Sequence, residues 1–177
     1  MAHLEHLELL KSGVRVWNRW RRQHSQIRPN LRGADLRGCD LAGFELSRAY
    51  LGSADLSRAY LFEANLRDTN LQRANLSHCC LIGGNLKHAY LADANLYHAY
   101  LSQADLTEAY FGYANLEQAN LTNSILHMAY FGQADIKQTD FSRVGDLAPL
   151  QLRMAHNFDQ AIFDPAASLQ LASTRQH

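Results

Sequence analysis

The chain has 177 residues with 17 basic (Lys or Arg) and 17 acidic side chains, and its formal net charge is zero. This length suits one domain, and the balanced charge gives no global argument for a nucleic-acid or membrane partner. The N-terminus lacks the apolar run of a signal peptide, and no segment reaches transmembrane length. Three cysteines without a secretory signal predict reduced thiols. We therefore expect a cytoplasmic protein that binds no membrane, with nucleic acid disfavoured as a partner.

The first 29 residues are expected to form a helical cap. Their apolar side chains follow helical spacing and end before Pro29, which precedes a different pattern: Leu4, Leu7, Leu10, Val14, Trp17 and Trp20. The same segment carries Arg15, Arg19, Arg21 and Arg22. Such a run either binds an anionic partner or forms the solvent-facing side of a cap helix, and the second interpretation is favoured.

A five-residue repeat occupies residues 30–143. A large apolar residue recurs at 23 successive positions from Leu31 to Phe141, and 19 of them are Leu. A small residue precedes each large residue from Leu36 onward by two positions. It is Ala in 15 of 22 cases, and the one large residue at such a position is Phe44. Asp, Asn or Tyr stands between the two at most steps.

A period of five matches neither a helix nor a plain strand, but it matches a short extended triplet followed by a corner. In an extended triplet the first and third residues point to one side and the second to the other. The small residue and the Leu therefore point inward, and the Asp, Asn or Tyr points outward. Repeated corners of one hand produce a solenoid, whose open ends need caps.

Residues 144–177 are expected to form the second cap and a tail. Asp146 is a candidate N-cap for a helix whose apolar residues are Leu147, Leu150, Met154 and Phe158. Asp164 and Pro165 are expected to open a second short helix.

The tandem triplets resemble the pentapeptide repeat family. They read AlaAspLeu at 34–36, 54–56 and 104–106, and AlaAsnLeu at 64–66, 74–76, 94–96 and 114–116. The flanks GVRVWNRWR and LAPLQLRMAHNFDQAIFDP look like those of cyanobacterial members. The resemblance implies a right-handed quadrilateral β-helix with four pentapeptides per coil. The expected fold is therefore an all-β solenoid with helical caps at both ends.

With four repeats per coil, residues 20 apart stack, and the outward aromatic side chains fall on two opposite faces. The first face carries Tyr90, Tyr110 and Tyr130, with Tyr50 further along; the second carries Tyr60, Phe62, Ile82 and Tyr100 around Cys80. Exposed apolar surface often marks an interface with a partner or a second copy. The alternative is that stacked tyrosines only stabilise the sheet. Both interpretations stay open.

The remaining histidines and cysteines of the repeat do not suggest a metal site or a disulfide. His78 and His98 are expected to be neighbours, but no third metal ligand is evident and Arg58 continues their row, so a solvated polar row is favoured over a metal site. Cys39 and Cys79 point inward two coils apart, about 10 Å by ladder spacing, which is too far for a disulfide. We expect no cofactor, no small-molecule substrate and no enzymatic activity, since a filled solenoid leaves no internal pocket.

Two functions are considered. The first is a protein-interaction module or scaffold that presents rows of identical side chains on flat faces. The second follows from the resemblance, because some members of the family look like B-DNA and bind DNA gyrase. A rod of about 28 Å would need about 16 negative charges to imitate DNA. Residues 30–143 hold 12 acidic and 9 basic side chains, a net charge of −3, which disfavours the DNA mimic.

Overall fold

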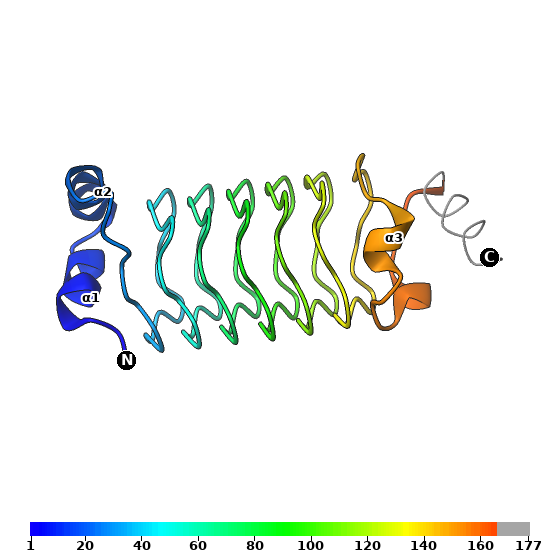
Figure 1. Ribbon diagram of the computed structural model, residues 1–177, viewed down its shortest axis with the longest axis horizontal. Helices are drawn as coiled ribbons and strands as arrows, with labels where there is room; N and C mark the ends of the chain where they lie inside the picture. The colour runs from blue at the N-terminus through cyan, green and yellow to red at the C-terminus, as the bar shows by residue number, and fades with distance from the viewer. Residues whose placement is uncertain (166–177) are drawn as a thin grey trace.

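The computed structural model, which describes residues 1–165, is a rod of stacked coils with helices at both ends (Figure 1). Helices α1 (Leu4–Lys11) and α2 (Val14–Gln23) lie at one end. Helix α3 (Pro149–Leu152) and a 3₁₀ turn (Phe158–Gln160) lie at the other. None of the helices in residues 1–165 has the length and hydropathy needed to cross a membrane.

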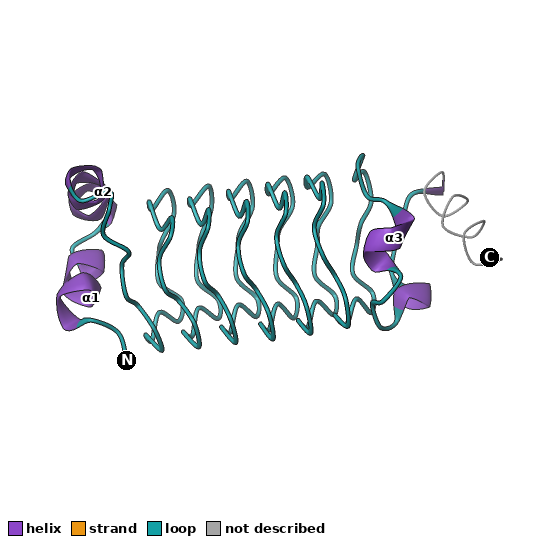
Figure 2. Cartoon of the chain, in the orientation of Figure 1, coloured by secondary structure: helices purple, strands orange, loops and turns teal. Residues whose placement is uncertain are grey.

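Successive coils pair through single parallel bridges between residues 20 apart. Asp55, for example, bridges Asp35 on one side and Asn75 on the other. The amide of Leu36 donates to the carbonyl of Asp55 at 2.8 Å, and the amide of Asp55 donates to the carbonyl of Ala34 at 2.9 Å. One coil therefore contains four pentapeptides. Because each bridge involves one residue per side, Figure 2 draws the coils as loops.

The core is a filled column of large side chains. Every inward large residue from Leu31 to Phe141 is at most 2% exposed, which confirms the inward assignment. Three polar residues occupy small inward positions. The hydroxyls of Thr69 and Thr139 donate to the carbonyls of Leu46 and Leu116, whereas the buried hydroxyl of Ser124 has no hydrogen-bond partner among the described residues.

A type II turn forms each corner. The amide of Ala34 donates to the carbonyl of Leu31 at 3.1 Å, and Gly33 between them has φ = 64°. The equivalent residue of every repeat from Gly33 to Arg143 has φ between 52° and 67°. Most of these residues are not glycine, so the regular hydrogen bonds of the coils hold them in the left-handed region that this turn requires.

Two helices, separated at Gly13, form the N-terminal end. Gly13 has φ = 93°, a value that side chains disfavour, and it is the N-cap of α2. The apolar residues of this end are only partly buried: Trp17 is fully buried, whereas Leu4 is 73% exposed. The ring of Trp17 lies 6.4 Å from that of Phe44. The one large residue at a small position of the repeat thus fills the space beneath the cap.

The C-terminal prediction of a helix starting at Asp146 was wrong. The N-cap of α3 is Ala148, and the carboxylate of Asp146 instead accepts a hydrogen bond from the amide of Leu126. Leu150 is 75% exposed and Met154 57% exposed, whereas Leu152 is buried. A helix from Asp146 would leave the open edge of the last coil without partners, and an open edge of this kind must be covered.

The chain after α3 covers that edge with extended backbone. His156 bridges Asp135, and Ile162 bridges Asp140. The ring of Phe163 stacks on Phe141 at 5.4 Å and continues the core column. The helix expected after Asp164 and Pro165 falls on residues 166–177, outside the described part of the chain.

Candidate protein-binding faces

The tyrosines of the first face form one stack. The ring centroids of Tyr90 and Tyr110 are 5.1 Å apart with a 20° tilt, and those of Tyr110 and Tyr130 are 4.8 Å apart with a 16° tilt. Tyr50 is not part of it, because Asn70 occupies the intervening coil. Its hydroxyl instead accepts a hydrogen bond from Arg28 at 3.3 Å. The stack therefore spans three consecutive coils.

The rings of Tyr110 and Tyr130 lie over the glycine two residues later. A Cβ atom added to Gly112 would lie 2.5 Å from Cε1 of Tyr110, and one added to Gly132 would collide with the ring of Tyr130. Glycine two residues after the tyrosine therefore leaves room for the ring. The triplet Tyr-Phe-Gly at 110–112 and 130–132 is a sequence signal for this arrangement that the five-residue pattern alone does not single out.

Packing in the stack also affects the phenol groups. Burial and the neighbouring phenols of Tyr130 and Tyr90 raise the pKa of Tyr110, because both disfavour the phenolate. Tyr110 in the middle of the stack is half-buried, whereas Tyr90 and Tyr130 at its ends are 40% and 46% exposed.

The opposite face presents its aromatic residues differently. Tyr60 is 60% exposed, Tyr100 50% and Phe62 46%. Tyr60 and Tyr100 are two coils apart, and Cys80 bridges both through the backbone. Ile82 lies one coil beyond Phe62, since its carbonyl accepts the amide of Glu63. The structure therefore gathers these predicted residues on one surface, hereafter the Tyr60–Tyr100 face, with rings that project toward solvent.

A histidine pair lies at the corner next to this face. The imidazoles of His78 and His98 stack at 5.2 Å with an 11° tilt, and the ring of Tyr97 meets both edge-on. Within residues 1–165 no group of three His, Cys, Asp or Glu side chains converges in a way that suits a metal ion.

The three cysteines of the repeat form no disulfide in the described structure. Cys39, Cys79 and Cys80 are free, and burial raises the pKa of the Cys79 thiol far above its usual value. The buried Cys79 acts as a small core residue.

Ion pairs offset much of the acidic charge of the coil. Arg37 donates to both carboxylate oxygens of Asp35, at 2.8 and 2.7 Å, and these bonds lower the pKa of Asp35 to about 2. Lys87 lies 3.0 Å from Asp105, and Lys137 lies 3.1 Å from Glu117. The coil therefore carries interspersed charges of both signs rather than an unbroken anionic row.

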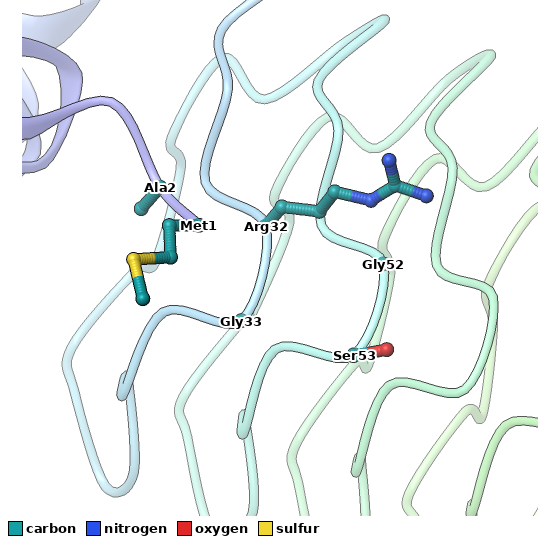
Figure 3. A pocket seen from close by; sticks show the side chains of 6 residues that line it. All are labelled: Met1, Ala2, Arg32, Gly33, Gly52 and Ser53. Carbon is teal, nitrogen blue, oxygen red and sulfur yellow. The ribbon is translucent and has the colours of Figure 1, made fainter.

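Two of the surface depressions within residues 1–165 lie beside the coils. Figure 3 shows one of about 310 Å³ next to the N-terminus, where the side chain of Arg32 extends past Gly52; its lining is Met1, Ala2, Arg32, Gly33, Gly52 and Ser53. The other, of about 640 Å³, runs beside Asp35, Arg37, Ser57, Arg58, Ser77 and His78. Asp35 and Arg37 pair with each other there.

Comparison with known proteins yields one family and several similar structures. A family model of pentapeptide repeats, eight copies long, matches residues 30–68, 69–107 and 104–143. No curated protein matches the chain.

Three similar structures are HetL, alr5209 and QnrB1. HetL, involved in heterocyst differentiation regulation in the cyanobacterium Nostoc sp. strain PCC 7120, is 30% identical over 76% of this chain and 62% of its own, with a TM-score of 0.45. This chain thus spans less than two thirds of HetL.

The pentapeptide repeat protein alr5209, also from Nostoc, is 32% identical over 62% of this chain and 84% of its own, with a TM-score of 0.46. QnrB1, a plasmid-mediated fluoroquinolone resistance protein, is 16% identical over 79% of this chain and 85% of its own, with a TM-score of 0.38. At these TM-scores the likenesses carry no functional argument.

Proposed function

Because the chain belongs to the pentapeptide repeat family, we propose that it is a non-enzymatic protein-interaction module that presents rows of side chains on flat solenoid faces. Its cytoplasmic location and the right-handed winding of the coil stay predictions.

One observation carries the proposal: the aromatic side chains of the Tyr60–Tyr100 face project into solvent. Tyr60, Phe62 and Tyr100 are between 46% and 60% exposed. Tyrosine and phenylalanine are enriched at protein contact sites, where they bury large area at low entropic cost. The stacked rings of Tyr90, Tyr110 and Tyr130 offer a flatter, second surface to a partner or a second copy.

The alternative of a gyrase-binding DNA mimic is less well supported. Such a mimic needs a dense row of unpaired negative charge. Here the carboxylates of Asp35, Asp105 and Glu117 each lie next to a cation.

Two matched variants test the proposal. One replaces Tyr60, Phe62 and Tyr100 by Ser, and the other replaces Tyr90, Tyr110 and Tyr130 by Ser. Proteins captured from a lysate of the source organism are compared with those captured by the wild type. We expect a specific partner that the first variant loses and the second retains. Identical capture by all three folded baits would contradict an aromatic interface, and capture of gyrase would revive the mimic.

A further inference from the structure

We propose that the N-terminal end of the rod docks on an anionic lipid surface through three arginines of α2: Arg15, Arg19 and Arg22. The zero net charge of the chain conceals a segregation of charge. Residues 1–33 contain seven Lys or Arg and two Glu, whereas residues 34–165 contain nine Lys or Arg and fifteen Asp or Glu. One end of the rod is therefore basic and the remainder is acidic.

The inner side of α2 is anchored to the first coil. The indole Nε1–H of Trp17 donates to the carbonyl of Glu45 at 2.8 Å, and Asn18 donates to the carbonyl of Gly43 at 2.9 Å. Arg21 is only 4% exposed, and its guanidinium donates to the carbonyl of Ile27 at 2.7 Å and to that of Ser47 at 3.1 Å. Arg21 is thus a structural residue that takes no part in binding an external anion.

The other three arginines lie on the side of the same helix away from Trp17 and Arg21. Spacings of four and three residues align Arg15, Arg19 and Arg22 in one stripe, and all three are exposed. Helix α2 lies at the end of the rod (Figure 1), and Trp17 and Arg21 contact the coil, so the stripe lies on the side of the helix turned away from these two contacts. The anchoring contacts hold it in a defined orientation.

The stripe is electrostatically unfavourable in the isolated protein. Arg15 and Arg19 are like charges four residues apart, which destabilise a helix, and Arg15 lies in the first turn, where a cation opposes the helix dipole; Arg22 lies in the last turn, where the dipole favours it. The first turn of α2 has no acidic residue. Among the ion pairs of residues 1–165 none involves Arg15, Arg19 or Arg22. An external anion would relieve this repulsion.

Exposed apolar side chains at the same end favour lipid over nucleic acid. Val16, next to Arg15, is 46% exposed, Ile27 is 41% exposed and Leu4 is 73% exposed. Headgroup phosphates pair with guanidinium groups, and the acyl boundary accepts apolar side chains, whereas a nucleic-acid backbone rewards only the charges. An end-on orientation also keeps most of the acidic coil beyond the Debye length of roughly 10 Å.

Vesicle flotation tests this docking. Phosphatidylcholine vesicles are compared with and without phosphatidylserine, using the full chain. We expect binding only to the vesicles that contain phosphatidylserine. The variant R15Q/R19Q/R22Q should bind about 100-fold more weakly, since each arginine near the surface contributes roughly fivefold. The matched control R58Q/R143Q/R153Q removes three other exposed charges, and we expect it to retain at least a tenth of the wild-type affinity.

Two further measurements make the result decisive. The variant R15K/R19K/R22K keeps the charge and should still bind, which separates loss of charge from loss of fold. Fluorescence anisotropy measures binding of the protein to duplex DNA, the alternative anionic partner. Equal binding to both vesicle types, equal losses in the two glutamine variants, or arginine-dependent binding that favours DNA over vesicles would each overturn the proposal.

Discussion

Trp17 and Glu45 fasten the N-terminal helices to the coil: the indole Nε1–H donates to the Glu45 carbonyl at 2.8 Å, and the Trp17 side chain is fully buried. This carbonyl belongs to the first coil, where no preceding coil covers the core. The contact therefore combines apolar burial with satisfaction of a backbone acceptor.

Replacing Trp17 by Ala should lower the free energy of unfolding by about 3–5 kcal/mol, because it opens a cavity beneath the cap. Trp17→Phe retains most of the apolar contact and should cost less, with about 1–3 kcal/mol arising from the unpaired Glu45 carbonyl. Urea unfolding of the three proteins measures both effects. Equal stability of the Ala variant and the wild type would show that the cap does not contribute to the cooperative unit.

Replacing Leu86 by Asp should abolish cooperative folding. Leu86 is fully buried in the central coils, and an unpaired carboxylate there loses its hydration without gaining a partner. The control Gln103→Asp places the same side chain on an exposed corner and should unfold as the wild type does. Circular dichroism melting curves decide the matter. An unchanged melting curve for Leu86→Asp would contradict the inward assignment of the repeat.

Replacing Gly112 by Ala should destabilise the protein by about 1–3 kcal/mol, because the new methyl group overlaps the Tyr110 ring and forces it to move. A control is Gly145→Ala, where no atom lies within 4 Å of the added Cβ. In the double variant Tyr110→Ser/Gly112→Ala the clash disappears, so the two changes should be non-additive. Additive losses in denaturant unfolding would show that the ring does not lie over Gly112.

The raised pKa of Tyr110 predicts a loss of stability in strong base. Its folded-state pKa lies above the unfolded value of about 10, because burial and the neighbouring phenols disfavour the phenolate. The stabilising contribution is therefore fully present below pH of about 10 and is lost as the pH rises through the folded-state pKa.

Ultraviolet absorbance titration of the wild type and Tyr110→Phe checks this prediction. The difference between the two curves isolates the ionisation of Tyr110, which should occur at a pH above the ordinary tyrosine pKa of about 10. A difference curve centred on the ordinary tyrosine pKa would contradict it.

The repeat by itself determined the inward and outward sides of the coil. A Leu at every fifth position with a small residue two places earlier leaves one arrangement that buries both, so residues such as Leu86 and Ala89 could be assigned without coordinates. The stacking interval of 20, confirmed by bridges such as Tyr90 to Tyr110, came from the family resemblance, because a period of five alone does not set the number of sides.

The tertiary structure alone decided how individual side chains and the chain ends are used. Tyr110 lies over Gly112 while Tyr60 projects, although both occupy the same position of the repeat, because the residues around each ring differ. Arg21 is buried while Arg22 is exposed, because only the first has coil carbonyls within reach. Beyond Asp146, the unpaired edge of the last coil outweighs local helix signals and draws the chain into extended pairing. Such choices depend on contacts between residues distant in sequence, which a local pattern does not contain.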